Sequence, residues 1–135
     1  MPKAFAILIH TGQGAGHYDF LLEQTQQASA STWQFTDNPL ELMLPGDVNQ
    51  TKIVGRKIQD HRLMYLDYEG PLSNGRGQVR RLDGGTYEII SQADTKMIFC
   101  LSGGAMQGLF TLELTDGHWV LRLCHAGPEA GGCKV

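Results

Sequence analysis

The chain has 135 residues, of which 41% are hydrophobic, and its formal net charge at pH 7 is −3. This length and apolar content fit one compact domain with a hydrophobic core. No stretch approaches the roughly 20 apolar residues of a membrane-spanning helix, and the first residues lack a secretory signal pattern. We therefore expect a cytoplasmic protein with no membrane partner. The negative net charge excludes a surface that is basic all round, as in proteins that coat nucleic acid.

Apolar and β-branched runs predict an almost entirely β protein. The tight-hairpin signal Asp116-Gly117 separates the last two runs. The expected strands span 4–10, 17–23, 31–36, 52–58, 62–68, 77–82, 86–91, 96–101, 107–114 and 118–124, and one short helix is expected at 39–44.

Seventeen glycines and short, evenly spaced strands favour a closed antiparallel architecture. We expect an all-β, mainly antiparallel fold: a small closed or partly closed β-barrel with at most one or two short helices. A single domain is predicted over residues 1–124, and a flexible glycine-rich tail over residues 125–135.

Three potential metal ligands surround a glycine-rich bend early in the chain: His10, His17 and Asp19. If the six residues between the histidines close a hairpin, the two imidazoles form a facing cross-strand pair. Asp19 then shares their face, because side chains alternate along a strand. Two imidazoles and one carboxylate suit Mn²⁺ or Zn²⁺. Ordinary hydrogen-bonded or solvated histidines are the competing interpretation.

The same segment is also compatible with a dinucleotide-binding unit, with a strand over 5–10, a glycine loop and a helix over 18–28. The glycine spacing is G-x-G-x-G rather than G-x-G-x-x-G. Nothing after residue 45 alternates strands with helices, so no parallel sheet could be completed. The hairpin is therefore favoured over the nucleotide-binding unit.

Basic residues are concentrated between residues 52 and 81, where seven of them stand against three acidic residues. This local excess of positive charge suits phosphate, although an ordinary solvated strand face gives the same pattern. The seven basic residues are Lys52, Arg56, Lys57, Arg62, Arg76, Arg80 and Arg81.

Several patches of the chain resemble the 3′-phosphoesterase domain of bacterial DNA ligase D. The run His17-Tyr-Asp-Phe-Leu-Leu-Glu23 is similar to the family's H-Y-D-F-R-L-E. The run Asp60-His61-Arg-Leu-Met-Tyr65-Leu-Asp-Tyr-Glu-Gly70 is similar to its D-H-P-L-x-Y-x-x-F-E-G. Trp33 followed by Pro39, the run Gly85-Thr-Tyr-Glu88 and the glycine pattern from Leu101 to Leu112 complete a likeness that covers roughly residues 4–123.

The resemblance implies a compact β-barrel that removes ribonucleotides and phosphates from 3′ ends during DNA repair. It implies a divalent cofactor, typically manganese, held by His10, His17 and Asp19; zinc stays possible from the donor set alone. His61 and Tyr65 would contact the reacting phosphate, where such groups stabilise charge or protonate a leaving oxygen. Since they lie four residues apart, a regular strand over 62–68 would also place them on one face.

The resemblance further implies which molecules the protein would meet. The implied partners are nucleic-acid 3′ ends, of DNA or of DNA with a terminal ribonucleotide, and repair ligase or polymerase proteins; we expect a monomer. The candidate phosphate-binding residues are Lys52, which matches a basic family position to within one residue, and Arg56 and Arg76 from the basic segment.

Departures from the family pattern bear on activity. Six residues rather than five separate the histidines, the family's arginine after the aspartate is Leu21, and the lysine after the tryptophan is Asp37. Loss of two cations from an anion site weakens transition-state binding unless other residues replace them. Three functions therefore stay open: a metal-dependent enzyme with weakened activity, an inert module that binds nucleic-acid ends or proteins, and a small-ligand-binding β-barrel.

Overall fold

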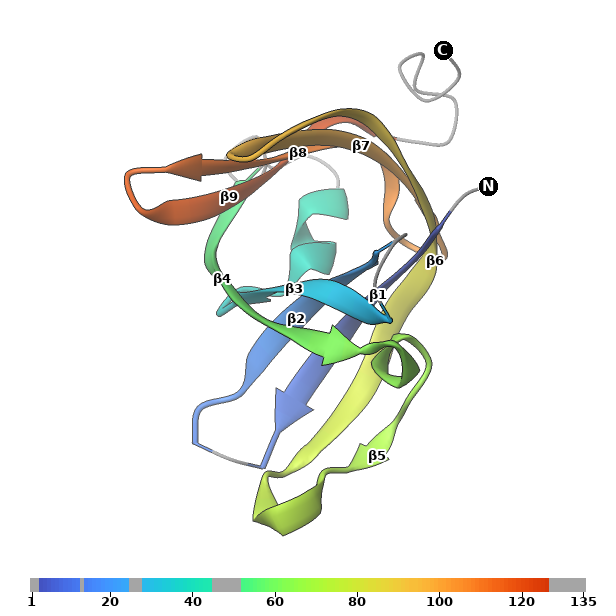
Figure 1. Ribbon diagram of the computed structural model, residues 1–135, viewed down its shortest axis with the longest axis vertical. Coiled ribbons are helices and arrows are strands. Elements are labelled where there is room, and N and C mark those ends of the chain that lie inside the picture. Colours follow the sequence, from blue (N-terminus) through green and yellow to red (C-terminus); the bar gives the residue numbers. More distant parts are fainter. Residues whose placement is uncertain (1–2, 13, 25–27, 45–51, 127–135) are drawn as a thin grey trace.

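A single antiparallel sheet dominates the structure, a computed structural model that describes residues 3–12, 14–24, 28–44 and 52–126. Within these residues the strand order is β1-β2-β3-β4-β9-β8-β7-β6-β5, and β1 also pairs with β6. The sheet therefore closes into a ring, with the short β5 attached to β6 (Figure 1). The predicted all-β class and antiparallel closure are confirmed. The strands are β1 (Lys3–Thr11), β2 (His17–Glu23), β3 (Ser29–Phe35), β4 (Lys52–Arg62), β5 (Gly70–Pro71), β6 (Gln78–Ala93), β7 (Lys96–Gly103), β8 (Gln107–Thr115) and β9 (His118–Ala126).

Helical structure in the described residues is limited to short 3-10 turns: η1 (Pro39–Met43), η3 (Leu63–Leu66) and η4 (Ser73–Gly75). The expected short helix at 39–44 is η1, which begins where the Asn38 side chain accepts a 3.0 Å hydrogen bond from the Leu40 N–H. None of the helices described is long and apolar enough to cross a membrane.

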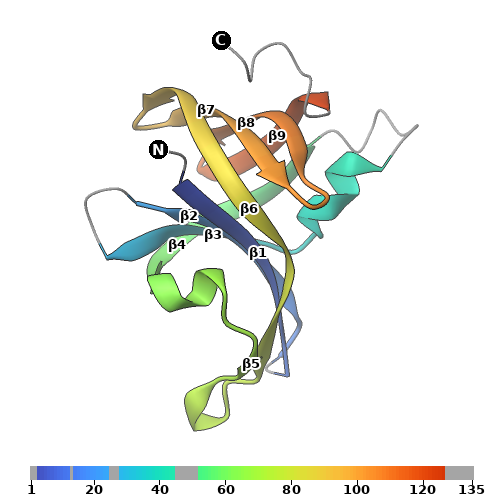
Figure 2. The same cartoon turned by 90° about the vertical axis from the view of Figure 1, so that its right-hand side faces the viewer.

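Two strand predictions are wrong. The chain leaves the sheet after Arg62 and turns through η3, so there is no strand over 62–68. The strands expected at 77–82 and 86–91 are one bent strand, β6, which pairs first with β1 and then with β7 (Figure 2). At Gly85, within β6, a Cβ would lie 2.1 Å from the Ser102 carbonyl oxygen. Glycine therefore allows close backbone approach here without ending the strand.

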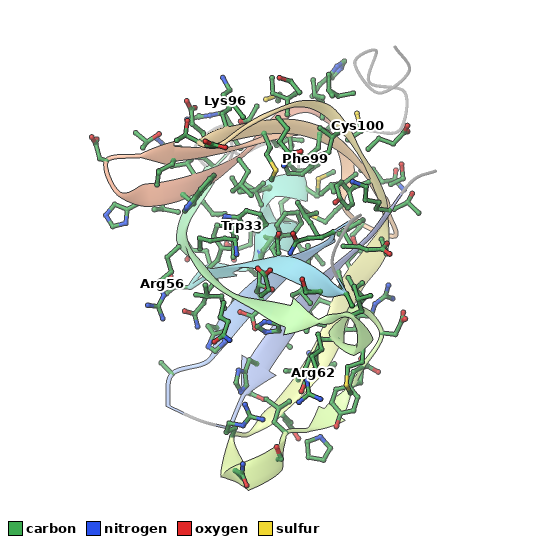
Figure 3. All side chains as sticks on the ribbon, in the orientation of Figure 1. Trp33, Arg56, Arg62, Lys96, Phe99 and Cys100 are labelled. Carbon is green, nitrogen blue, oxygen red and sulfur yellow. The ribbon has the colours of Figure 1, made fainter. Side chains whose placement is uncertain are left out.

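The ring encloses the main hydrophobic core. Phe99 stacks against both Phe20 and Phe110, with ring centroids 6.0 and 6.2 Å apart, and all three side chains are fully buried. Trp33 from β3 also packs into this core, whereas Arg56 from β4 lies outside the ring (Figure 3). Side chains of every strand except β5 contribute to the core, which explains why the ring closes.

A second, smaller hydrophobic cluster covers the outer face of the first strands. The segment that follows β4 crosses this face, and Leu66 of η3 packs against it. Alternate residues of β1 and β2 face the core, and the residues between them face this second cluster. Both strands are therefore buried on both faces. We call this the outer cluster; its buried members are Ala6, Leu8, Leu21, Ala30, Leu66 and Val79.

The turn between β7 and β8 is held by one buried carboxylate, that of Asp83 on β6. The Asp83 oxygens accept hydrogen bonds from the backbone N–H groups of Gly104 at 2.9 Å, Ala105 at 3.2 Å and Met106 at 2.7 Å. Hydrogen bonds to a charged acceptor are stronger than those between neutral groups, and a buried donor left without its partner is costly.

We expect Asp83→Ala to lower the free energy of unfolding by about 3 kcal/mol, because it leaves these N–H groups without an acceptor. Chemical denaturation followed by circular dichroism measures the loss. Asp37→Ala, at an exposed position, is the matched control and should change stability by less than about 0.5 kcal/mol. Equal stability of the two variants would show that the turn does not depend on Asp83.

Candidate metal centre

β1 and β2 form the predicted hairpin, and His10 lies directly opposite His17. Gly12 and Gly14, in the bend between them, have φ values of +89° and +61°. These left-handed conformations favour glycine and let the bend accommodate six residues. The prediction of a facing histidine pair is confirmed.

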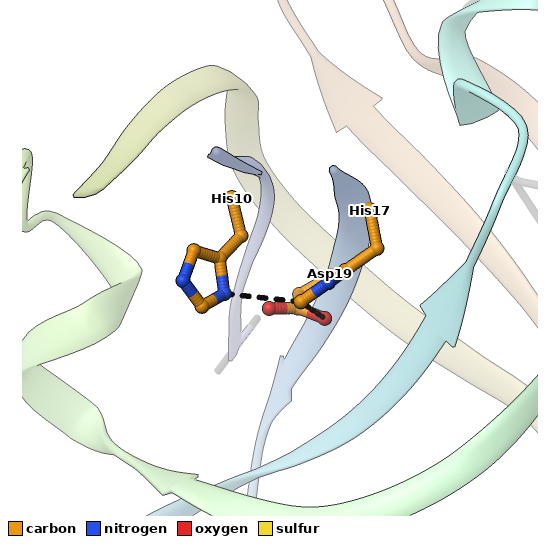
Figure 4. Close-up of side chains that lie close together, drawn as sticks. All are labelled: His10, His17 and Asp19. Atoms are coloured by element: carbon orange, nitrogen blue, oxygen red, sulfur yellow. Dashed lines mark hydrogen bonds and ion pairs between the residues drawn. The ribbon is translucent and has the colours of Figure 1, made fainter. Parts of the chain in front are cut away.

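The ligand atoms of His10, His17 and Asp19 all lie within 4.8 Å of one another on the outer face of the hairpin (Figure 4). His10 Nδ1 lies 3.1 Å from His17 Nε2, and His17 Nε2 lies 3.5 Å from Asp19 Oδ1. Two atoms bound at about 2.1 Å to one ion are about 3.0 Å apart at a right angle and about 3.4 Å apart at the tetrahedral angle. The spacing is therefore compatible with a single divalent ion.

Two features of the donor set fit a cation. Asp19 is only 2% exposed, and its Oδ1 has no hydrogen-bond partner among the described residues. A buried carboxylate oxygen without a partner is costly, and a bound cation would satisfy it. His10 Nε2 lies 2.6 Å from the Arg76 carbonyl oxygen, which can only accept a hydrogen bond. Nε2 therefore carries the proton, and the Nδ1 lone pair is directed toward His17.

The protonation state of His17 also suits a ligand. Burial lowers the pKa of His17 from its ordinary value of 6.5; the nearby His10 and Arg56 lower it further, while Asp19 acts in the opposite direction. The imidazole is therefore neutral at neutral pH, as metal coordination requires.

His61 and Tyr65 lie in the same pocket, but the local structure that places them there was not predicted from the sequence. The pairing of β3 with β4 shifts between Thr32, opposite Ile58, and Ala30, opposite His61. This bulge turns His61 onto the outer face, where its Nε2 lies 3.6 Å from Asp19 Oδ2. Tyr65 belongs to η3, and its ring centroid lies 5.6 Å from that of His61. The two residues are neighbours, but the regular strand expected to bring them together does not exist.

A pocket of about 590 Å³ contains these five residues and two of the three predicted phosphate-binding residues, Arg56 and Arg76. Arg56 Nε donates a 2.8 Å hydrogen bond to Gln34 Oε1, which orients the guanidinium. Lys52 is exposed at the opposite end of β4, in register with Arg122 of β9, and does not line this pocket. We therefore leave Lys52 out of the candidate site.

Sequence reasoning missed two groups that orient the predicted site residues. Gln34 has no motif to identify it; its signal is its position opposite Arg56 in the pairing of β3 with β4. The Arg76 carbonyl that holds His10 is a backbone group, and no side-chain pattern could predict it.

The two missing family cations have different surroundings in this chain. Leu21 is fully buried in the outer cluster, two residues beyond Asp19 on the same face, so that position is filled by an apolar side chain. Arg56, from the strand two along, supplies a guanidinium to the same pocket instead. Asp37 is exposed and does not line the pocket.

The chain belongs to the DNA ligase D 3′-phosphoesterase domain family, whose model matches residues 9–114. The matched range contains the histidine pair, Asp19, His61 and Tyr65. A comparison with curated proteins gives no match. Family membership supports a phosphoesterase-like protein, and the converging triad is compatible with a divalent metal.

We expect Asp19→Asn to weaken Mn²⁺ binding by at least about a hundredfold, because the variant removes the only charge among the three ligands while keeping their shape. Isothermal titration calorimetry on the full chain measures the affinity. His125→Ala, at an exposed histidine of β9, is the control and should bind Mn²⁺ like the unmodified protein. Equal affinities for all three proteins would place the ion elsewhere.

The loop that holds His10 depends on a close glycine contact. Gly77 has φ +86°, and a Cβ at this position would lie 2.1 Å from the Thr11 carbonyl oxygen. Gly75, in the same loop, has φ +68°, but a Cβ there would meet nothing within 4 Å. Substitution of either glycine by alanine would strain the backbone, but only the substitution at Gly77 would also cause a steric clash.

We expect Gly77→Ala to weaken Mn²⁺ affinity by about tenfold, because the clash moves the Arg76 carbonyl away from His10 Nε2. Gly75→Ala is the matched control for backbone strain and should keep the affinity within about twofold. Calorimetric titration of both variants checks this. An equal loss in both would assign the effect to loop strain rather than to His10 orientation.

Proposed function

We propose that this protein is a divalent-metal-dependent 3′-phosphoesterase that acts on nucleic-acid 3′ ends in DNA repair. Family membership supports the phosphoesterase class. The observation that carries the metal dependence is the buried Asp19 carboxylate, which has an unpartnered oxygen beside two imidazole nitrogens. Manganese is the proposed ion, since the family resemblance implies it and mixed nitrogen and oxygen donors suit it.

In this proposal the candidate metal ligands and Arg56 have separate tasks. His10, His17 and Asp19 would hold the ion, which when bound polarises a phosphoryl oxygen or activates water. Arg56, oriented by Gln34, binds phosphate oxygens and partly replaces the cations absent from this chain.

Proton transfer is assigned to His61, with Tyr65 beside it. His61 Nδ1 donates to the Gln59 carbonyl oxygen at 3.3 Å, so its Nε2 is the nitrogen that faces Asp19 and the pocket. As the imidazolium, protonated on both nitrogens, His61 would transfer the Nε2 proton to the leaving 3′ oxygen of the substrate, and the Tyr65 hydroxyl would donate a hydrogen bond to the phosphoryl group. Both residues lie in the pocket with the candidate ligands.

The proposed substrates are 3′ ends of DNA, or of DNA with a terminal ribonucleotide, and the proposed protein partners are repair ligases and polymerases acting with a monomer. The buried Leu21 favours one alternative, a module of the same fold that binds nucleic-acid ends without turnover, because the family's arginine at this position is lost.

We expect Mn²⁺-dependent release of phosphate from an oligonucleotide with a 3′ phosphate, abolished by chelation with EDTA. His61→Ala should reduce turnover by about a hundredfold while leaving Mn²⁺ affinity unchanged, since positioned acid–base groups contribute roughly 10²–10⁴-fold. His125→Ala serves again as the control. If the unmodified protein binds Mn²⁺ and 3′ ends but releases no phosphate, the inert module replaces the enzyme.

A further inference from the structure

A second pocket, of about 730 Å³, lies at the end of the ring where β1 begins and β2 ends. Its walls include Trp33 of β3, Lys57 of β4 and Trp119 of β9. It shares no lining residue with the pocket of the candidate metal centre. We call it the end pocket.

Two tryptophans line the end pocket, and Trp119 offers the more accessible ring. Trp33 and Trp119 meet edge to face, with ring centroids 5.8 Å apart and planes at 70°. Trp119 is only partly buried, so part of its indole stays open to the pocket. Planar rings stack favourably on such a surface.

Trp33 also contributes a donor that has no acceptor. Its side chain is 4% exposed, and among the described residues its Nε1 has no hydrogen-bond partner. An indole N–H can only donate, and buried donors without acceptors are rare in native proteins because they are costly. The Nε1 atom is closed to solvent in this structure, so a ligand in the end pocket would reach it only after the indole moved.

Two lysines add positive charge to the end pocket. The Lys57 ammonium lies 5.2 Å from the Trp33 ring centroid and forms a 3.1 Å ion pair with Asp60. The Lys3 ammonium lies 5.7 Å from the centroid of the Tyr87 ring and forms no ion pair with any described residue. Lys3 is therefore the cation available to an anionic ligand group.

We propose that the end pocket binds a nucleobase that carries a phosphate. The base would stack on Trp119, and the phosphate would contact Lys3. Every base offers both an aromatic face and hydrogen-bond acceptors, and stacking on aromatic side chains tolerates any sequence. A free nucleotide and a nucleotide within a single strand share this chemistry. The inference goes beyond the proposed phosphoesterase activity and requires no metal.

The chain supplies its own probe for the test. It contains two tryptophans, and both line the end pocket. Intrinsic tryptophan fluorescence therefore reports on this pocket alone. The full chain is titrated in EDTA with adenosine monophosphate and with a short oligodeoxyadenylate that has a free 3′ hydroxyl. We expect saturable quenching with both ligands and none with inorganic phosphate or ribose 5-phosphate.

Three variants separate the contacts. Trp119→Leu keeps an apolar side chain, loses the stacking surface and should weaken nucleotide binding by about tenfold. Lys3→Gln, at a partly exposed position, should weaken binding of adenosine monophosphate by about threefold and leave binding of adenosine unchanged. His17→Ala should leave quenching unchanged, because His17 lies in the other pocket. If Trp119→Leu does not fold, Lys3→Gln still tests the assignment.

Some outcomes distinguish a nucleic-acid strand from a free nucleotide as the ligand, and others would reject the proposal. Tighter binding of the oligonucleotide than of the mononucleotide identifies a strand as the ligand, and equal binding identifies a free nucleotide; both support the end pocket. No quenching by either base-carrying ligand at millimolar concentration overturns it. An equal effect of Lys3→Gln on the binding of adenosine and of adenosine monophosphate also overturns it. Because the assay contains no metal, its failure leaves the phosphoesterase proposal untouched.

Discussion

β1 and β2 are covered by apolar side chains on both faces, and the rest of the structure depends on this constraint. Phe5 and Ile7 face the core, whereas Ala6 and Leu8 lie in the outer cluster. A shift of one residue in the pairing of these strands would exchange the two faces, so the register is strongly specified. The same register places the candidate metal ligands together at the edge of the outer cluster. The ligand geometry is thus a consequence of how two apolar faces are packed.

The candidate site lies on these two packed strands and contains a buried carboxylate that is electrostatically costly. Asp19 is buried beside Leu21 on the outer face, and one of its oxygens has no hydrogen-bond partner among the described residues. A packed core could fill the position with an apolar side chain more stably. Retention of a carboxylate there is typical of a group whose partner is a ligand rather than the protein. Binding of a cation would therefore stabilise the folded state as well as prepare the chemistry.

Much of the site follows from local rules, and the remainder depends on tertiary structure. Alternation along two strands and a glycine-rich bend were enough to predict the facing pair of His10 and His17. The position of His61 depends on a bulge in the pairing of β3 with β4, and bulges have no reliable sequence signal. Separate strands were expected at 77–82 and 86–91 because the close approach of the Gly85 backbone to Ser102 becomes visible only when β7 is in place. Lys52 was assigned because it matches a basic family position to within one residue, and such a match does not show which end of β4 faces the pocket.

The side-chain alternation of β4 assigns its residues to two different pockets. Arg56 and Ile58 face the candidate metal centre, whereas Lys57 between them lines the end pocket. Asp60 connects the two: Lys57 Nζ lies 3.1 Å from its Oδ1, and Gln24 Nε2 donates to its Oδ2 at 2.6 Å. Partial burial raises the pKa of Asp60, but the hydrogen bonds from Lys57 and Gln24 outweigh it and hold the pKa below 3.8. The carboxylate therefore stays ionised at neutral pH, and it lies next to His61 in the segment where the pairing of β3 with β4 shifts. One ion-paired residue thus joins the wall of the end pocket to the residue that we assign to proton transfer.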